Sequence, residues 1–375
     1  MAAVSGTTIR WGIVGTGVAA RMFAEDLRLL PDAAVVAICS RDQMRAAEFG
    51  RRFRAKHAHA SVPELAQNND VDVVYIATPH IRHRADCLAC FAGGKPVLCE
   101  KPFTLNAHEA REVIAGARSH QLFCMEAMWM RFQPLIIRVR SLVQSGMIGQ
   151  VRLLQADLGY RTPFDPNGRF FNPALGGGAL LDRGVYPLSL AFFLLGQSEA
   201  ANSGASVGPT GVDEQMAALL TYSAGGLAVL TASLRSRQRN EALIIGTQGQ
   251  VRIHEPFFAP RRVTVTTFAD PPASTASDRS ALVGWLSQVK RHPAVRRVYD
   301  RIARPALGLL RRESSQLEHY ASGHGYQYEA AEVMRCLRAG ERESPLQTLG
   351  DTLVLLEVMD ALRRSWGVTY PGEPG

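Results

Sequence analysis

Short apolar runs alternate with helical patterns over the first 127 residues of the chain. The runs are nearly continuous, which is typical of strands that are buried on both faces. The expected strands lie at 8–14, 35–39, 71–77, 96–99 and 122–125, and the expected helices at 19–30, 42–53 and 106–118. Asn106 followed by Glu109 resembles a capping box at the start of the third helix. The alternation predicts a doubly wound parallel sheet.

The pattern changes after residue 127. A helix is expected at 134–145, and helical patterns return at 326–338 and 348–365. The strands expected between them lie at 151–160, 215–222, 227–234, 241–246, 249–254 and 262–268. Their short spacing predicts a large, mostly antiparallel, open sheet in an α+β domain. We therefore expect two domains, an α/β domain at 1–127 and the α+β domain at 128–375.

Gly15, Thr16, Gly17 and Ala20 lie in a Gly-x-Gly-x-x-Ala turn between the first expected strand and the first expected helix. The first glycine allows a tight turn, and the second lets the backbone approach a pyrophosphate. The alanine lets the helix pack close to the strand, and the helix N-terminus attracts the anion. The turn predicts a Rossmann domain that binds a dinucleotide. A plain βα turn is the alternative, because glycine-rich turns also occur for steric reasons alone.

The residues after the second strand bear on the choice of nicotinamide cofactor. An acid at this place would bind the 2′-hydroxyl of NAD and repel the 2′-phosphate of NADP. The chain has Ser40 and Arg41 there and no acid before Asp42. The guanidinium can pair with the phosphate and stack on adenine, and the hydroxyl can add a hydrogen bond. These residues favour NADP, whereas an arginine that is only solvated at a helix start is the alternative.

The net charge of +8 over 375 residues is concentrated in one segment. Seven of these charges come from residues 285–312, which contain eight Lys and Arg and one acid. Such local charge argues against a fold that binds nucleic acid. We expect a basic insertion at about 270–312 with a mobile loop at 270–280. It is a solvated, partly helical excursion, a lid, a surface for acidic lipid or an oligomer contact.

The six cysteines and the apolar segments bear on the cellular compartment in which we expect the protein. Cys87 and Cys90 form a C-x-x-C pair inside a helical pattern, and no second pair follows at zinc spacing. We therefore expect buried free thiols, no metal site and a reducing cytoplasm. The N-terminus has no signal-peptide pattern. The longest apolar stretch, 185–195, is too short to span a bilayer, so no integral membrane segment is expected.

Two polar segments follow expected strands of the first domain. His80 and His83 lie shortly after Thr78, and Glu100 directly precedes Lys101. The carboxyl ends of parallel strands hold the ligands of such sheets, so both segments are expected to face the nicotinamide. A lysine directly after a buried strand must be paired or neutralised, and a structural salt bridge with the preceding glutamate is one alternative. The histidines contact the cofactor or cap the following helix.

Three motifs in this order resemble those of the glucose–fructose oxidoreductase and inositol dehydrogenase family. They are Gly15-x-Gly17-x-x-Ala20, Ala77-Thr78-Pro79-x-x-x-His83 and Glu100-Lys101-Pro102. Segments 125–132 and 176–187 are similar to the branch of trans-dihydrodiol dehydrogenases and NADP-dependent D-xylose dehydrogenases. The resemblance covers nearly the whole chain except about 270–312.

The resemblance implies an NADP(H)-dependent oxidoreductase without a metal. Tyr186 would be the acid/base, Lys101 would lie beside the nicotinamide and the reacting hydroxyl, and Asp182 would orient the substrate. Apart from the resemblance, we expect Trp129 and Tyr320 to line the substrate pocket with Asp182 and Tyr186, with Tyr320 coming from the Tyr320-x-x-Gly323-x-Gly325 loop. Ordinary aromatic packing is the alternative for both Trp129 and Tyr320. The expected cofactor contacts are Gly15, Thr16, Gly17, Ala20, Ser40, Arg41, Thr78, His80, His83, Glu100 and Lys101. We expect a homo-oligomer that forms through the C-terminal sheet.

The chemistry of a tyrosine base agrees with this assignment. An unperturbed tyrosine ionises near pH ~10 and is a poor base at neutrality. The ammonium of Lys101 is expected to favour the tyrosinate of Tyr186 and to lower its pKa. Structural roles for Tyr186, as a half-buried aromatic, and for Asp182, as a cap, are the alternatives.

One residue departs from the pattern of the branch. Arg183 follows Asp182 where the branch usually has an aliphatic residue, and it either competes for Asp182 or selects an anionic substrate. The expected function is hydride transfer between NADP(H) and a carbinol or hemiacetal carbon of a sugar or cyclic diol. Two alternatives are a nicotinamide-dependent glycoside hydrolase of the same fold and a catalytically silent protein that senses NADP(H).

Overall fold

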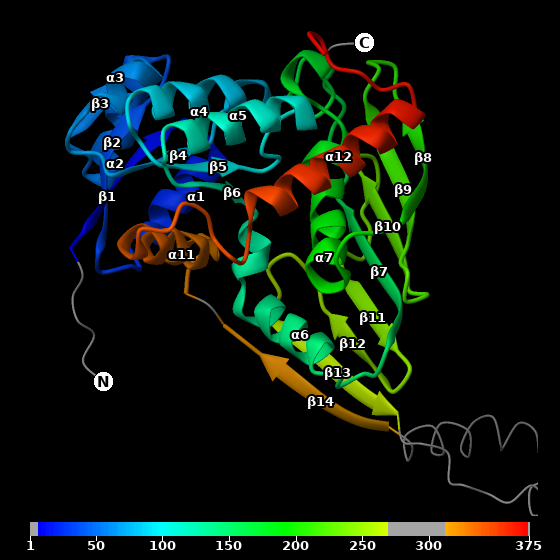
Figure 1. The fold of residues 1–375 in the computed structure, drawn as a ribbon. Helices are drawn as coiled ribbons and strands as arrows, with labels where there is room; N and C mark the ends of the chain where they lie inside the picture. The colour runs from blue at the N-terminus through cyan, green and yellow to red at the C-terminus, as the bar shows by residue number, and fades with distance from the viewer. Residues whose placement is uncertain (1–6, 269–311, 321, 374–375) are drawn as a thin grey trace, which may run out of the picture.

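The computed structural model describes residues 7–268, 312–320 and 322–373 (Figure 1). The expected loop at 270–280 and the basic segment 285–311 lie outside the described residues.

The first sheet has six parallel strands in the order β3-β2-β1-β4-β5-β6. The strands are β1 (Ile9–Val14), β2 (Ala33–Cys39), β3 (His57–His59), β4 (Val73–Ile76), β5 (Val97–Glu100) and β6 (Cys124–Ala127). The helices are α1 (Val18–Leu27), α2 (Gln43–Phe53), α3 (Val62–Ala66), α4 (His83–Ala92) and α5 (Ala107–Ser119). The strand order reverses beside β1, as in the dinucleotide-binding Rossmann fold, and the predicted doubly wound sheet is confirmed.

Two short elements of this part were not predicted. Strand β3 contains only His-Ala-His and lies at the edge of the sheet, so it has no apolar run that periodicity would detect. Helix α3 has five residues and begins at Ser61, whose hydroxyl accepts from the backbone N–H of Glu64. The predicted cap of α5 is confirmed, because the Asn106 side chain accepts from the N–H of Glu109 at 2.9 Å.

The second sheet has eight strands in the order β14-β13-β12-β11-β7-β10-β9-β8. Its strands are β7 (Val151–Gly159), β8 (Ala200–Val207), β9 (Asp213–Thr221), β10 (Leu227–Ser233), β11 (Ala242–Gly246), β12 (Gly249–Ile253), β13 (Arg262–Phe268) and β14 (Arg312–Glu318). All neighbours pair antiparallel except β7 and β10, which are parallel. The predicted mostly antiparallel sheet is confirmed. The two edge strands, β8 and β14, were not predicted because small and polar residues replace the apolar alternation there.

The C-terminal helices return to the first sheet. Helix α6 (Pro134–Gln144) and α7 (Val185–Leu195) belong to the second part, and α7 packs on β7 and β10. In contrast, α11 (Tyr326–Ala339) packs on α1, and α12 (Leu349–Ser365) reaches from α5 to α7 and β8 (Figure 1). A division at residue 127 therefore separates the two sheets but not the helices that join them.

Helix α7 and the turns before it form the apolar centre of the second part. By length and composition, the 23 residues Pro173–Leu195 would reach across a bilayer, with a mean hydropathy of 1.3. However, 89% of the apolar window is buried inside the protein, as in the core helix of a soluble protein. All six cysteines are free and buried, as expected.

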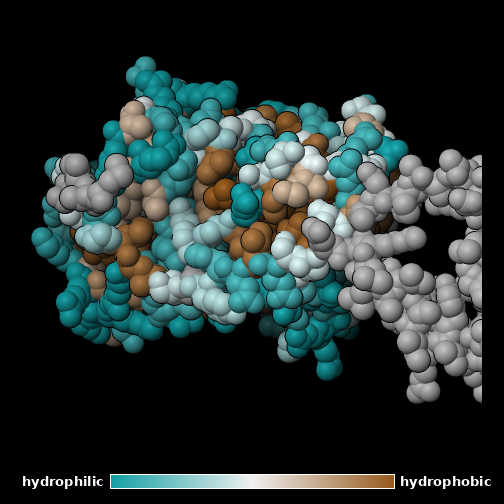
Figure 2. All heavy atoms as spheres, turned by 90° about the horizontal axis from the view of Figure 1, so that it is seen from below, coloured by the Kyte–Doolittle hydropathy of each residue, from teal (hydrophilic) through white to brown (hydrophobic). Residues whose placement is uncertain are grey.

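Apolar residues also reach the surface. Viewed from below, they gather in the middle of the visible face (Figure 2). A hollow lined by α6 and α11 contains Phe132, Pro134, Ile137, Tyr328 and Leu346. This hollow does not include the polar residues that follow the strands of the first sheet.

Candidate active site

The glycine turn leaves room and hydrogen-bond donors for a phosphate. Gly15 has a φ of +109°, and a Cβ there would lie 2.5 Å from the carbonyl oxygen of Ala77. Gly17 precedes α1, offers no side-chain cap, and a Cβ there would meet nothing within 4 Å. The first intrahelical bond runs from the N–H of Arg21 to Gly17, so the N–H groups of the first turn stay open. The turn therefore fits the pyrophosphate of a dinucleotide.

Ser40 and Arg41 lie beside this turn. The backbone N–H of Gly15 donates to the carbonyl of Cys39, at the end of β2, at 2.9 Å. The carboxylate of Asp42 caps α2 by accepting from the N–H groups of Met44 and Arg45, so this acid is already engaged. The exposed guanidinium of Arg41 has no hydrogen bond or ion pair with any residue that the structure describes.

Lys101 joins the two halves of the site. Its Nζ donates to the backbone carbonyl of Asp182 at 2.8 Å and lies 3.7 Å from the Oδ1 of the same residue. Asp182 lies in a π-helical turn, Leu180–Gly184, directly before α7. Such turns free a carbonyl from the helical pattern and are common at functional sites. The two domains thus meet at the predicted catalytic lysine.

The proposed salt bridge between Lys101 and Glu100 does not form. The Glu100 carboxylate turns inward, where its Oε1 accepts from the hydroxyl of Tyr75 at 2.5 Å. Its Oε2 accepts from the backbone N–H of Lys101 at 3.0 Å. Burial raises the pKa of Glu100. The side chain therefore holds the turn that follows β5 and leaves the ammonium free to face Asp182.

Three cations surround Asp182. Its Oδ1 lies 3.3 Å from the guanidinium of Arg169, and its Oδ2 lies 3.7 Å from that of Arg183, in addition to the contact with Lys101. Burial alone would raise the pKa of Asp182, but the three positive charges hold it below its ordinary value. The carboxylate is ionised at neutral pH and is able to accept hydrogen bonds from a substrate.

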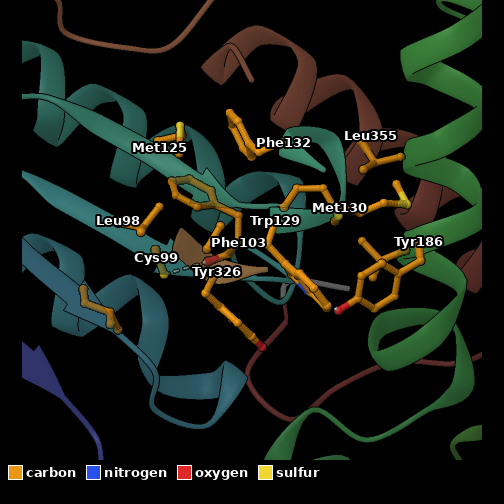
Figure 3. Packing of buried hydrophobic residues seen from close by; sticks show 14 of the residues in the cluster. Leu98, Cys99, Phe103, Met125, Trp129, Met130, Phe132, Tyr186, Tyr326 and Leu355 are labelled. Carbon is orange, nitrogen blue, oxygen red and sulfur yellow. Dashed lines mark hydrogen bonds between the residues drawn. The ribbon is translucent and has the colours of Figure 1, made fainter. Parts of the chain in front are cut away.

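The hydroxyl of Tyr186 is turned towards Trp129 (Figure 3). The indole Nε1–H donates to this oxygen at 2.9 Å, and the Nζ of Lys101 lies 4.7 Å from the centre of the tyrosine ring. Burial raises the pKa of Tyr186 well above its usual range, and the Glu100 carboxyl adds to the rise. The expected shift towards neutrality is therefore wrong for this form of the protein, in which the ammonium faces the ring and not the oxygen.

Aromatic side chains form one wall of the site. The ring of Trp129 stacks on Tyr326 with a centroid distance of 4.8 Å, and Phe258 packs against both Trp129 and Tyr186. Tyr320, which was expected to line this wall, is 71% exposed and hydrogen-bonds to Glu318. Tyr326, six residues later, lies against Trp129 instead.

The histidines after β4 serve the backbone. Both ring nitrogens of the fully buried His83 lie 2.9 Å from carbonyl oxygens, those of Thr78 and Pro102. The ring therefore joins the turns after β4 and β5 and has no nitrogen left for the expected cofactor contact. The Thr78 hydroxyl likewise donates to Asp86 at 2.8 Å.

His80 lies at the contact between the two parts. Its Nδ1 is 3.2 Å from the carbonyl of Gly176, in the turn that precedes the π-helical turn. Burial lowers the pKa of His80 to about 3, and the nearby His83 and Lys101 contribute to this shift. The imidazole is therefore neutral at physiological pH and adds no charge to the site.

The contacts of Arg183 bear on its two expected roles, which were competition for Asp182 and selection of an anionic substrate. Its guanidinium donates to the backbone carbonyls of Tyr160 and Ser233 and to the hydroxyl of Thr162. Only its Nε faces Asp182. Arg183 therefore holds the loop after β7 in place, and its donors are not available to an anionic substrate.

Sequence reasoning missed four residues that belong to this cluster: Tyr75, Arg169, Phe258 and Tyr326. Each lies on a different element, and none is part of a motif. In the structure Gly325, directly before Tyr326, has a φ of +110°, and a Cβ there would lie 2.4 Å from the side chain of Gln133.

Two family descriptions match the chain. Residues 9–128 match an oxidoreductase family with an NAD-binding Rossmann fold, and residues 136–252 match the GFO/IDH/MocA C-terminal domain. The chain is 35% identical over 368 residues to trans-1,2-dihydrobenzene-1,2-diol dehydrogenase of Sus scrofa, covering 97% of this chain and 98% of that protein. The enzyme of the same name from Homo sapiens is 33% identical over 371 residues, with coverages of 97% and 98%.

Solved structures share the whole fold. A levoglucosan dehydrogenase in complex with NADH superposes with a TM-score of 0.78 at 18% identity, over 97% of this chain and 100% of that one. A 3-ketoreductase from Actinomadura kijaniata, in complex with TDP-benzene and NADP, gives a TM-score of 0.72 at 24% identity, over 95% and 97%. The protein binds a nicotinamide dinucleotide, and it belongs to the Gfo/Idh/MocA oxidoreductase family.

Proposed function

We propose that this protein is an NADP(H)-dependent dehydrogenase or reductase that acts on a carbinol or hemiacetal carbon of a sugar or cyclic diol. The observation that carries the proposal is the contact of Lys101 with Asp182, four residues before Tyr186, at the carboxyl edge of the Rossmann sheet. The names of the relatives, which include dihydrodiol and levoglucosan dehydrogenases, support this substrate class.

Tyr186 is the proton donor and acceptor. Its oxygen accepts from Trp129, and among the described residues it donates to none, so its proton is free for a substrate oxygen. In the reducing direction the hydroxyl gives this proton to the carbonyl oxygen of the substrate, and in the oxidising direction the tyrosinate, once deprotonated, receives a proton from the alcohol. When bound, the nicotinamide would supply a hydride to the substrate carbon that bears this oxygen, or accept one from it.

Lys101 and Asp182 hold the reacting group. The ammonium of Lys101 can donate to the substrate oxygen and so stabilise the charge that develops there. The ionised carboxylate of Asp182 accepts from a neighbouring hydroxyl, which fixes the orientation of the ring. Both side chains are largely enclosed, which strengthens these interactions relative to those in water.

We assign NADP as the preferred cofactor. The free guanidinium of Arg41 and the hydroxyl of Ser40 suit a 2′-phosphate. Asp42, which might have bound the hydroxyl of NAD, caps α2 instead.

The test is an activity screen with two variants. Initial rates are measured with NADP⁺ and NAD⁺ across aldoses, inositols and trans-dihydrodiols. Lys101→Ala and Tyr186→Phe should each lower kcat by about a hundredfold or more while NADPH binding persists. Tyr222→Phe is the matched control, because the buried Tyr222 hydroxyl has no hydrogen-bond partner in the part of the chain that the structure describes. Unchanged turnover in both variants contradicts the proposal.

The same experiment separates the alternatives. A nicotinamide-dependent glycoside hydrolase would cleave glycosides without net reduction of the cofactor. A sensor of NADP(H) would bind the cofactor and turn over no substrate, and the two variants would then differ from the wild type only in binding.

We also propose a homo-oligomer that forms through the outer face of the second sheet. Leu219 and Val229 lie opposite each other on β9 and β10, and both are more than a third exposed. Charging them with Leu219→Glu and Val229→Glu should shift the sedimentation coefficient to that of a monomer. Met147→Glu, which charges another exposed apolar residue, should leave the assembly unchanged.

A further inference from the structure

The loop after β7 brings a second arginine to Asp182. The Arg169 guanidinium lies 3.3 Å from the Oδ1 of Asp182 and 4.1 Å from the centre of the Phe170 ring. In contrast to Arg183, Arg169 is 56% exposed. It has no hydrogen bond in good geometry with any residue in the described ranges. Its donors are therefore oriented by the ring and the carboxylate but remain open to a ligand.

The charges around Asp182 do not balance. Lys101, Arg169 and Arg183 carry three positive charges against one carboxylate. His80 is neutral, because burial lowers its pKa to about 3. Glu100 is turned away towards Tyr75, and even if it is counted as ionised, the site keeps an excess of positive charge.

The other acid of this loop does not compensate for the excess. The Asp165 carboxylate accepts from the backbone N–H of Asn167 at 3.0 Å, and it makes no ion pair with the described cations. The positive charge of Arg169 therefore lies beside Asp182 without being neutralised by the other acid of its own loop.

A solvated arginine is the ordinary explanation for an exposed guanidinium, but two observations argue against it. A solvated side chain would not be held both on an aromatic face and beside a buried carboxylate. In addition, Asp182 already has Lys101 and Arg183, so it does not need a third cation for its own charge.

We propose that Arg169 binds an anionic group of the substrate, a carboxylate or a phosphate, while Asp182 and Tyr186 hold its hydroxyl groups. The inference rests on the proposed function and narrows its substrate class from neutral sugars and diols to their anionic counterparts. A planar guanidinium binds both anions through two parallel hydrogen bonds, which gives direction as well as affinity.

The test compares matched substrates on the enzyme with NADP⁺. One set contains D-glucose, D-glucuronate and D-glucose 6-phosphate. The other set contains D-galactose and D-galacturonate. The anionic member of at least one set should have a kcat/KM about tenfold or more above its neutral counterpart. Preference for the uronate or for the phosphate identifies the anion.

Two variants locate the effect. Arg169→Gln should lower kcat/KM for the anionic substrate about tenfold more than for its neutral counterpart, and Arg169→Lys should restore part of the difference. Arg161→Gln removes an equal charge from an exposed position of the same loop, so it should keep the preference. The anion site would be overturned if the wild type had the same kcat/KM for neutral and anionic substrates. It would also be overturned if Arg169→Gln lowered kcat/KM equally for all substrates.

Calorimetry separates this inference from the proposed function. D-glucuronate or D-glucose 6-phosphate is titrated into the protein loaded with NADP⁺, for the wild type and for Arg169→Gln. Binding that depends on Arg169 without any turnover would contradict the oxidoreductase proposal but support the anion site. Turnover of neutral substrates with no binding of either anion would contradict only the anion site.

Discussion

The indole Nε1–H of Trp129 donates a hydrogen bond of 2.9 Å to the hydroxyl oxygen of Tyr186. Trp129 begins the 3₁₀ helix η2 (Trp129–Phe132), just after the last strand of the Rossmann sheet, whereas Tyr186 belongs to α7 of the second part. The bond therefore links the segment that directly follows the Rossmann sheet to the predicted acid/base. It also fixes the tyrosine oxygen as an acceptor, so that its own proton faces outward.

Replacing this indole tests the link. Trp129→Phe keeps an aromatic ring against Tyr326 but removes the only hydrogen bond that the Tyr186 hydroxyl makes within the described residues. Because that bond lowers the pKa of Tyr186, its loss should raise this pKa further. We expect kcat to fall about tenfold, the rising limb of the pH profile for oxidation, where Tyr186 loses its proton, to move to higher pH, and NADPH affinity to persist.

Trp366→Phe is the control for this variant. Its indole donates to Ser203 at 3.0 Å, outside the active-site cluster. It should lose the same type of hydrogen bond without a change in the pH profile. A Trp129→Phe enzyme with the profile of the wild type would mean that the indole only packs.

The two glycines of the first turn should respond differently to alanine. Gly15→Ala places a Cβ 2.5 Å from a backbone oxygen at a φ of +109°, so the protein should lose about 1–3 kcal/mol of stability. Gly17→Ala meets nothing within 4 Å, so the melting temperature should stay the same. Its methyl group would occupy the place of the pyrophosphate, and the Kd for NADPH should rise about tenfold or more. Unchanged binding in Gly17→Ala would show that the phosphates lie elsewhere.

The proposed preference for NADP rests mainly on the guanidinium of Arg41. Arg41→Ala should raise the KM for NADP⁺ by about tenfold or more and leave the KM for NAD⁺ unchanged, because only the 2′-phosphate of NADP⁺ loses its hydrogen-bonding partner. Arg45→Ala, which removes an exposed guanidinium beside Asp42, is the control. An equal effect of Arg41→Ala on both cofactors would indicate stacking on adenine without a phosphate contact.

The main elements of both sheets were predictable because their patterns are local. The apolar runs of β1, β4 and β5, the cap at Asn106 and the glycine turn each depend on neighbours in the chain. The order of the motifs then brought Lys101, Asp182 and Tyr186 to attention. Their contact, through a carbonyl that a π-helical turn frees, has no sequence signal of its own.

The environment of Tyr186 was not predictable in the same way. Its pKa is set first by burial and then by Glu100 on β5, with Glu329 on α11 adding to the rise. These residues are far apart in the chain, and their meeting depends on the return of α11 to the first sheet. The motif pattern, which places one lysine near the tyrosine, therefore predicted a lowered pKa for Tyr186, whereas its environment in the structure raises this pKa.

The exchange of Tyr320 for Tyr326 has a similar origin. The carboxylate of Asp26, on α1, accepts from the backbone N–H groups of His324, Gly325 and Tyr326. This anchor starts α11 at Tyr326 and directs that ring inward, whereas Tyr320 precedes the anchor and stays in solvent. The aspartate and the loop it holds are almost 300 positions apart in the chain.

Asp213 connects the stability of the active-site turn with pH. It lies fully buried on β9, and its Oδ2 accepts from the backbone N–H of Leu180, the first residue of the π-helical turn, at 2.7 Å. Its Oδ1 has no hydrogen-bond partner among the described residues. Burial raises the pKa of Asp213 from 3.8 to about 7.

A raised pKa means that the folded protein binds this proton more tightly than the unfolded chain. The contribution of Asp213 to stability is therefore complete below pH ~4 and is lost as the pH rises towards 7. Asp213→Asn keeps an acceptor for the N–H of Leu180 and does not titrate. The free energy of unfolding of the variant, relative to the wild type, should rise by about 2–4 kcal/mol between pH 4 and 7 and then stay constant.

Urea unfolding of both proteins at pH 4.5, 6, 7 and 8 measures this difference, and the other titrating groups cancel in the comparison. Ala217→Ser, at an exposed position of the same strand, changes no titrating group, so it is the control and should give a difference that does not change with pH. A flat difference for Asp213→Asn as well would mean that the buried carboxyl is ionised throughout and that the turn before α7 is held by a charge. A difference in unfolding free energy that rises with pH would instead show that Asp213 is protonated in the folded protein and that this proton stabilises the turn carrying Asp182. The protein would then lose this stabilising proton as the pH passes neutrality.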